Sequence, residues 1–342
     1  MAPALDGVSA ASAAAHSTVG VSAASDADAS STSAPAAPRK KRSVDYLLEG
    51  ESVKANRHLA RFAAAPFLPL LLREPAFGSM LSRTSKALRK EIIEAYVVIE
   101  ALEALARGPG LVVDLCSGKG FSSVLLALER PELAVLMVDS DQRILLDHVD
   151  ALPNVRFVRA DICAPGFGAA LDAALGAAAA ASSSAAAAVA AAADAFVAAA
   201  APAASAPTVA ADSAASPPSC VLVGVHLCGQ LSPRAVELFA AAPALDALLL
   251  VPCCLDKRFD ATLKAEARAA RRDPYDAKVE QLAALMAGVC DAVSCVRDAE
   301  MRTAAGTASE GAAAAKNAVL IGRRRVGVEP GACEVCEVVD TG

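Results

Sequence analysis

The sequence has no run of about 18 strongly apolar residues, which is the length that a membrane-spanning helix needs. Its hydrophobic share is 55%, but much of this is alanine, gathered in the first forty or so residues and in a block from about Phe167 to Pro218. Alanine in such blocks builds little core and is no membrane signal. We therefore expect no membrane partner.

A secretory signal is also missing, because the N-terminus has no basic start followed by an apolar core. The ten cysteines thus indicate a reducing compartment, where thiols are free or structural. Arginine is absent before Arg39 and three aspartates fall in the Ala/Ser-rich start, which is atypical of an organelle transit peptide but does not exclude one. The run Pro38–Arg42 resembles a nuclear address. We predict a cytoplasmic or nuclear protein.

Excess positive charge is lacking as well, since the formal net charge at pH 7 is -6. This value excludes broad, nonspecific affinity for nucleic acid, and we expect no DNA partner. The basic residues nevertheless gather locally, as solvated helix faces or, if the fold places them on one face, as a surface that grips phosphates. These clusters are Arg39–Arg42, Lys86 with Arg89 and Lys90, Arg268 with Arg271 and Arg272, and Arg323–Arg325.

Composition divides the chain into four parts, of which one is long enough for a single α/β domain. They are a disordered Ala/Ser-rich start at 1–43, a helical N-terminal extension at 44–110, a folded domain at 111–326 and an acidic tail at 327–342. An alanine-rich, low-complexity insertion at 167–218 interrupts the folded domain. Its first part, Phe167–Leu175, suits a crossover helix. The remainder has no stripe of larger residues to bury and is predicted to be disordered or a marginal surface helix.

Short apolar runs alternate with helical segments along the folded domain. The expected strands are Leu111–Leu115, Ala134–Val138, Val155–Val158, Val221–Val225, Ala247–Val251, Ala292–Val296 and Ala318–Gly322. The expected helices include Ser85–Leu105, Ser122–Leu128, Gln142–Val149 and a polar helical stretch at Ala261–Ala287. This alternation is typical of a doubly wound, mostly parallel α/β sheet with helices on both faces.

The turn after the first expected strand carries an acid and two glycines. Glycine lets the backbone pass close to a ligand, and this strand-to-helix turn is where open α/β sheets bind nucleotides. A Walker phosphate loop is excluded, because Val113 stands where its first glycine should be and Gly120 follows Lys119. The acid Asp114 at the strand end suits a cationic or hydroxylated ligand better than a pyrophosphate.

The spacing Asp114-x-Cys116-x-Gly118-x-Gly120 resembles the first motif of class I S-adenosylmethionine-dependent methyltransferases, an acid followed by three glycines at alternate positions. Cys116 stands in place of the first of those glycines, one small residue for another. The resemblance implies S-adenosylmethionine as cofactor. It also implies a Rossmann-like sheet of seven strands, the last two joined by a loop.

Acids follow the next two expected strands, as such a cofactor site requires. Asp139 can accept hydrogen bonds from both ribose hydroxyls, whereas Asp141 suits a helix cap better. Asp161 can accept from the adenine amino group, and Ile162 can cover the ring. The predicted cofactor-binding residues are Asp114, Cys116, Ser117, Gly118, Gly120, Asp139, Ser140, Asp161, Ile162 and His226.

A narrower resemblance rests on three later motifs: His226-Leu227-Cys228-Gly229 after the fourth strand, Cys253-Cys254 after the fifth, and Lys316-Asn317 before the last. Together they resemble the methyltransferase-domain family that includes the eukaryotic tRNA acceptor-stem ribose 2'-O-methyltransferase. The similarity covers roughly Ser85 to Arg325 without the alanine block. It implies an RNA substrate of the tRNA type and a ribose hydroxyl as methyl acceptor.

The end of the fourth strand lacks the Asp/Asn-Pro-Pro-Tyr/Phe motif that methylation of base amino groups usually employs. Hydroxyl methylation needs a proton acceptor, and the reference pKa of histidine lies nearest neutrality, so His226 suits that role unless it is structural. Asp256 or Lys257 could orient or deprotonate the acceptor. The predicted catalytic residues are His226, Cys254, Asp256 and Lys257.

Three other interpretations of these residues remain open. Cys228 with Cys253 or Cys254 matches the outline of pyrimidine C5 methylation, although proline does not precede Cys228. His226 and the same cysteines are zinc-type ligands, but adjacent cysteines rarely both bind one ion. Cys333 and Cys336 have no second ligand pair, and no metal site is predicted. A protein or small-molecule acceptor, or a silent binding module, would use the same fold.

Overall fold

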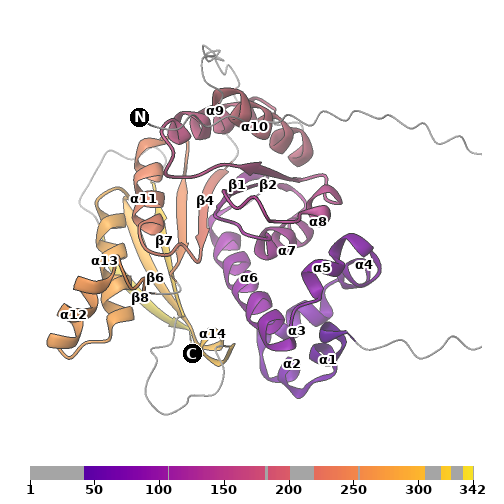
Figure 1. Cartoon of the computed structure of the whole chain (residues 1–342), viewed down its shortest axis with the longest axis horizontal. Helices are drawn as coiled ribbons and strands as arrows, with labels where there is room; N and C mark the ends of the chain where they lie inside the picture. Colours follow the sequence, from indigo (N-terminus) through magenta and orange to yellow (C-terminus); the bar gives the residue numbers. More distant parts are fainter. Residues whose placement is uncertain are drawn as a thin grey trace, which may run out of the picture. The chain divides into compact units, whose positions relative to one another are not determined.

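A computed structural model describes residues 42–106, 108–181, 184–200, 219–252, 255–304, 317–324 and 334–341. Within these residues eight strands form one sheet, in the order β3-β2-β1-β4-β5-β7-β6-β8. Figure 1 shows helices on both sides of this sheet. The strands are β1 (Gly110–Leu115), β2 (Leu133–Asp139), β3 (Val155–Arg159), β4 (Ser219–Val225), β5 (Ala247–Val251), β6 (Ala292–Asp298), β7 (Ala318–Arg323) and β8 (Glu334–Thr341).

Strands β1 to β5 run parallel, and β7 is antiparallel to both β5 and β6. The first seven strands confirm the predicted doubly wound, mostly parallel sheet with helices on both faces. Strand β8 was not foreseen: it comes from the acidic tail and pairs in parallel with β6. The chain order reverses at β1, which lies between β2 and β4, and ligands of open α/β sheets bind beyond the strand ends at this point.

Helices cover each face of the sheet. Successive side chains of a strand point to opposite faces, so each strand contributes apolar residues to both layers. In β1, Val113 faces one apolar layer and Val112 the other. One layer holds α1 (Ser43–Glu49), α2 (Glu51–Ala55), α3 (Arg57–Ala64), α4 (Leu68–Arg73), η1 (Pro75–Phe77), α5 (Gly78–Leu81), α6 (Ser85–Leu105), α7 (Phe121–Glu129), α8 (Asp147–Asp150) and α14 (Ala299–Ala304). The other holds α9 (Phe167–Ala180), α10 (Ala185–Ala200), α11 (Leu231–Ala241) and α13 (Pro274–Ala287), and α12 (Ala261–Ala269) packs on α13. No described helix is long and apolar enough to span a bilayer.

Helix α6 has the predicted bounds and forms the centre of the N-terminal extension. It begins after Thr84, whose hydroxyl accepts a hydrogen bond from Ala87 N at 3.3 Å. Leu88, Ile92 and Ile99 are fully buried at helical spacing and join α6 to the sheet layer. The extension is therefore packed on the sheet through its longest helix (Figure 1).

Two helix predictions were wrong in detail. The predicted helix Gln142–Val149 shrinks to the short α8, because the Asp141 carboxylate accepts hydrogen bonds from the backbone and side chain of Arg143 and so forms a local turn. The single stretch expected at Ala261–Ala287 is two helices. It breaks at Arg271, whose φ is +56°, and restarts after Asp273, whose carboxylate caps α13.

The alanine-rich insertion contributes more than the expected crossover helix. Its second part forms α10, which buries Val189, Ala192 and Phe196 against the sheet. The Phe196 ring meets the ring of Phe167 on α9 edge to face, with centroids 5.2 Å apart. Two larger residues among many alanines, Val189 and Phe196, are thus enough for α10 to pack on the α9 side of the sheet.

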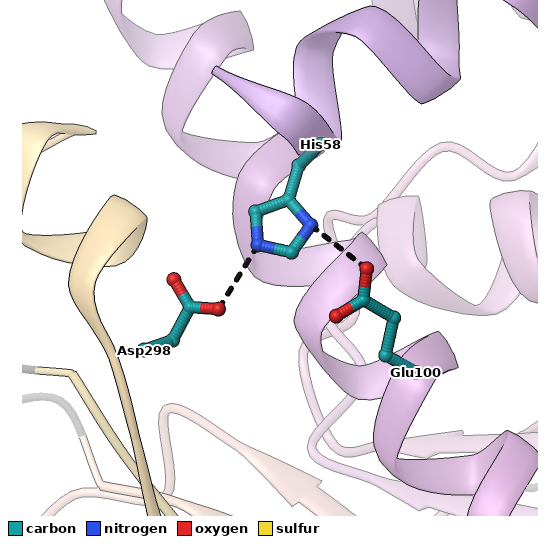
Figure 2. A group of neighbouring side chains, drawn as sticks. All are labelled: His58, Glu100 and Asp298. Atoms are coloured by element: carbon teal, nitrogen blue, oxygen red, sulfur yellow. Dashed lines mark hydrogen bonds and ion pairs between the residues drawn. The ribbon is translucent and has the colours of Figure 1, made fainter. Parts of the chain in front are cut away.

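A cluster of charged side chains connects the N-terminal extension to β6 (Figure 2). The fully buried His58 of α3 lies between two carboxylates: its Nε2 is 3.1 Å from Asp298 and its Nδ1 is 3.4 Å from Glu100 of α6. These are the three ligand-type groups that lie within 4.8 Å of one another in the described chain. The Arg57 guanidinium contacts both carboxylates, at 3.2 and 2.5 Å, and together with the protonated His58 it balances their two negative charges. The cluster is therefore a structural link rather than a cation site.

This link predicts a pH-dependent stability. Burial lowers the pKa of His58, but the hydrogen bonds and charges of Asp298 and Glu100 outweigh it and raise the pKa to about 9. Because the pKa of His58 is higher in the folded than in the unfolded protein, its protonation stabilises the fold. This contribution is complete below the unfolded pKa of about 6.5 and is lost as the pH rises through about 9. We expect the free energy of unfolding to fall by on the order of 3 kcal/mol across this window.

Urea unfolding at pH 6 and pH 9 measures this effect, with the His58→Gln variant as the comparison. The variant should be less stable than the wild type at pH 6. Its free energy of unfolding should also fall less between pH 6 and pH 9, because the His58 contribution is missing. Equal slopes for both proteins would contradict the assignment.

Candidate active site

The loop between β1 and α7 adopts the backbone conformation that its sequence suggests. Cys116, Gly118 and Gly120 all have positive φ, of 53°, 56° and 69°. A Cβ on Gly120 would overlap the Met137 side chain of β2, whereas a Cβ on Gly118 would meet no atom within 4 Å. Glycine at 120 thus allows the loop to approach β2, and glycine at 118 is needed for its φ alone.

Contacts from neighbouring strand ends hold this loop in place. Gly118 N donates to the Asp139 carboxylate at 2.9 Å, and Ser117 N donates to the Val138 carbonyl at 3.1 Å. The buried His148 of α8 donates from Nε2 to the Lys119 carbonyl at 2.7 Å. The contribution of His148 was missed, since nothing in its sequence neighbourhood points to a residue 29 positions earlier.

A cavity of about 240 Å³ lies between this loop and helix α6. It is lined by Arg83, Glu91, Glu94, Asp114, Cys116, Ser117, Gly118, Lys119, Gly120, Phe121, Ser122, Val225 and His226. Five of the predicted cofactor residues on the loop and the predicted catalytic histidine therefore face one space. Three further lining residues, Arg83, Glu91 and Glu94, come from α6 or the turn before it.

Asp114 is buried at the base of this cavity with one oxygen lacking a partner. Ser123 donates to Oδ2 at 2.5 Å, but Oδ1 has no hydrogen-bond partner among the described residues. Burial raises the pKa of the carboxyl to about 7; the Ser123 hydrogen bond opposes the rise and the charge of Asp139 adds to it. The nearby Ser117 hydroxyl is likewise buried without a described partner. Such polar atoms call for a ligand or water that donates to them.

Asp139 lies at the end of β2 with both oxygens facing backbone donors. Oδ2 accepts from Gly118 N, and Oδ1 accepts from Asp141 N at 2.8 Å. Each carboxylate oxygen can accept a second hydrogen bond, so two further donors can be held. Ser140 is exposed, and the Asp141 side chain is taken by Arg143.

Asp161 and Ile162 follow β3 but do not line the cavity. The exposed Asp161 carboxylate accepts from Cys163 N at 2.9 Å through one oxygen. Ile162 is only 1% exposed and its side chain belongs to the apolar layer of α9. Its suggested contact with an adenine ring stays a prediction.

The pKa of the Cys116 thiol is affected by all three strand-end acids. Burial raises its pKa to about 12, and the charges of Asp139, Asp114 and Asp161 act in the same direction. The strand-end acids predicted from the sequence therefore surround one position of the loop. The same pKa keeps Cys116 protonated near neutral pH, so it is not a nucleophile.

The positive φ of Cys116 predicts that glycine is better at this position. A non-glycine residue in the left-handed region carries strain of about 1–3 kcal/mol, which exceeds the unfolded-state entropy that glycine adds, about 0.4–1 kcal/mol. We expect Cys116→Gly to raise the free energy of unfolding by up to about 1 kcal/mol.

Chemical unfolding of Cys116→Gly beside Cys163→Gly tests this sign. Cys163 is exposed and has no positive φ, so its replacement should lower the stability instead. A loss of stability in both variants would show that Cys116 is not strained.

His226 lies at the end of β4 and has a φ of +64°. Its backbone N–H donates to the Val251 carbonyl of β5 at 3.2 Å. Its Nε2 is 3.0 Å from the Glu94 carboxylate and 3.2 Å from Lys90 Nζ, both on α6. Sequence reasoning missed these two partners. The signal was present as an i, i+4 Lys–Glu pair in which Glu94 stands beside apolar Ile93 and Ala95.

The other predicted catalytic residues do not line the cavity. The Asp256 carboxylate accepts from Arg258 N and Phe259 N, which hold its pKa below the ordinary value, and Lys257 is exposed. Cys254 lies outside the described residues, as do Cys253 and Cys333. The described residues therefore do not test the cysteine-nucleophile, zinc and Cys333–Cys336 alternatives, none of which was the predicted one.

No protein-family model matches the chain, and no curated protein matches it. Among solved structures it is similar to an O-methyltransferase family protein from Burkholderia thailandensis, with 15% identity over 80% of this chain and 71% of that one and a TM-score of 0.30. It is also similar to the plantazolicin methyltransferase BpumL in complex with SAH, with 12% identity, 80% and 97% coverage and a TM-score of 0.33. A third similar structure is the aminoglycoside resistance methyltransferase NpmB1, with 15% identity over 66% of this chain and 93% of that one and a TM-score of 0.33. These low scores add no evidence on activity or substrate.

Proposed function

We propose that the chain is an S-adenosylmethionine-dependent methyltransferase that acts on RNA, with a ribose hydroxyl as the acceptor. The observation that carries this proposal is the buried Asp114 Oδ1, which has no described partner and lies beside a glycine loop at the topological switch point. A ligand with a positively charged donor satisfies this atom, and the α-amino group of S-adenosylmethionine is such a donor. The sheet topology is the one expected for this class.

The residues at the strand ends suit the other parts of the same cofactor. Asp139 has a free acceptor position on each oxygen for the two ribose hydroxyls. Asp161 keeps one oxygen for the adenine amino group. Gly118 and Gly120 keep the loop backbone in its left-handed conformation beside the cavity. The bound cofactor supplies a methyl group on a sulfonium, and the protein supplies the binding and the proton acceptor.

His226 is the residue that receives the acceptor's proton in this proposal. It faces the same cavity as the cofactor loop and carries a positive φ, the kind of strain that gathers at active sites. An imidazole positioned beside a hydroxyl can act as its general base. The Asp256 carboxylate accepts hydrogen bonds within its own turn, and Lys257 does not line the cavity. Among the described residues predicted to be catalytic, His226 is therefore the candidate.

Cations around the cavity support a polyanionic acceptor. Arg83 and Lys119 line it, Lys90 contacts His226, and Lys86 is exposed on the same helix as Lys90. Lys86 and Lys90 are one turn apart on α6, where they can contact successive phosphates, and Arg83 lies in the turn before this helix. Together with the motif resemblance, these cations favour RNA over a small molecule.

Transfer of labelled methyl groups from S-adenosylmethionine into fractionated cell extract tests the function. We expect label in a fraction that RNase removes and protease does not, in products whose phosphodiester bonds resist alkali because the ribose 2'-hydroxyl is blocked. Label removed by protease, or found in small molecules, would replace RNA by another acceptor. Cofactor binding without any transfer would indicate a silent binding module, and no binding would overturn the proposal.

A further inference from the structure

We infer that Glu94 is a positioning residue for His226: the helical extension supplies the carboxylate that orients the proton-accepting imidazole. The inference rests on the proposed function, because it concerns the proton released when the acceptor hydroxyl is methylated. It adds two residues, Glu94 and Lys90, to the site residues predicted from the sequence.

The geometry places Glu94 and Lys90 on the same ring nitrogen. Glu94 Oε2 is 3.0 Å and Lys90 Nζ is 3.2 Å from His226 Nε2, while Lys90 Nζ is 2.9 Å from the Glu94 carboxylate. The three groups come from segments more than 130 residues apart in sequence. Their side chains are unequally exposed, at 10% for Glu94, 36% for His226 and 44% for Lys90.

A buried carboxylate in an apolar helix is costly unless its charge is compensated. Burial raises the pKa of Glu94, but the hydrogen bond and charge of His226 and the charge of Lys90 outweigh it and bring the pKa below its ordinary value. The carboxylate is therefore ionised near neutral pH and can accept a hydrogen bond from Nε2–H. Lys90 limits the excess of negative charge.

Glu94 can only accept and Lys90 can only donate, so their contacts with Nε2 require opposite tautomers of His226, and we assign the one in which Nε2–H donates to Glu94. With the Nε2 proton donated to Glu94, the unprotonated nitrogen is Nδ1, and no described residue hydrogen-bonds to it. A base held by a carboxylate through one ring nitrogen accepts a proton through the other.

The proton balance of the proposed step follows directly. The acceptor O–H bond breaks, an N–H bond forms at Nδ1, and the oxygen keeps the O–H electron pair. That oxygen bonds the methyl group while the sulfur retains the electrons of the broken S–C bond. The resulting imidazolium lies beside the Glu94 carboxylate, which stabilises it, and its proton is later lost to solvent.

The pH dependence of kcat distinguishes this role from simple packing. Removal of a neighbouring anion destabilises the imidazolium, so Glu94→Gln should lower kcat by about 10- to 100-fold and move the acid limb of the profile down by about one pH unit or more. Removal of the cation in Lys90→Met should move the limb up. The dissociation constant for S-adenosylmethionine should change less than about threefold in both variants.

Glu103→Gln is the matched control, because Glu103 lies on the same helix and pairs with Arg61 away from the cavity. It should leave kcat and the limb unchanged. Opposite shifts in the two variants support the inference, and Lys90→Met tests it even if Glu94→Gln fails to fold. If both variants fold and bind the cofactor but the acid limb of the pH profile of kcat stays at the wild-type position, the inference is overturned. A wild-type protein that transfers no methyl group would instead reject the proposed function itself.

Discussion

Replacement of Asp139 by alanine should weaken S-adenosylmethionine binding by at least about 30-fold. In the proposed function Asp139 accepts hydrogen bonds from both ribose hydroxyls, and hydrogen bonds to charged groups contribute about 1.5–3 kcal/mol each. The loss of the hydrogen bond from Gly118 N adds to the effect, because the loop then loses an anchor. A total of about 2 kcal/mol or more corresponds to the stated change in affinity.

Isothermal titration calorimetry of Asp139→Ala and Asp141→Ala provides the measurement and its control. Asp141 lies two residues further on, and its exposed carboxylate is taken by Arg143. Its replacement should change the affinity by less than about threefold. If both variants bind like the wild type, the ribose assignment fails; if only Asp141→Ala is impaired, the roles of the two acids are exchanged.

The second large effect concerns His226, where His226→Asn should lower kcat by about 10²- to 10⁴-fold. A positioned proton acceptor contributes about this much to transfer from a hydroxyl. Asparagine is chosen because it tolerates the left-handed conformation that His226 adopts, at a φ of +64°. Alanine at this position would add backbone strain to the loss of the imidazole.

Single-turnover kinetics with saturating S-adenosylmethionine measure this loss, with cofactor affinity and thermal unfolding recorded on the same protein. The affinity should stay within about threefold of the wild type. A variant that keeps most of its kcat but unfolds more easily would show that His226 is a structural residue of the site.

Local patterns predicted the sheet and the positions of the acids and glycines at the strand ends. The seven strands follow from short apolar runs bounded by turns, and the acids at 114, 139 and 161 follow from the rule that parallel strands end at one edge. The left-handed turn was also visible, since Cys116 stands where a glycine is usual and has a φ of +53°. Each of these features depends on neighbours in sequence.

The features that were missed depend on distant contacts or on a few side chains. Glu94 meets His226 across 132 positions, and no pattern within helix α6 shows which strand end it faces. Helix α10 packs through Val189 and Phe196, two larger residues that the alanine-rich composition concealed. The segment Gln142–Val149 has helical character, but the Asp141 turn outweighs it.

Helix α6 has a consequence for how this protein can change or be divided. It directs Glu94 to His226 and, six residues later, Glu100 to His58, two points about 9 Å apart along its axis. Its apolar side, with Leu88 and Ile92, contributes to the apolar layer on that face of the sheet, where α6 contacts β5. The extension before the first strand is thus not an exchangeable module. A shortened chain would lose a wall of the cavity, a partner of the histidine and a share of the core in one step.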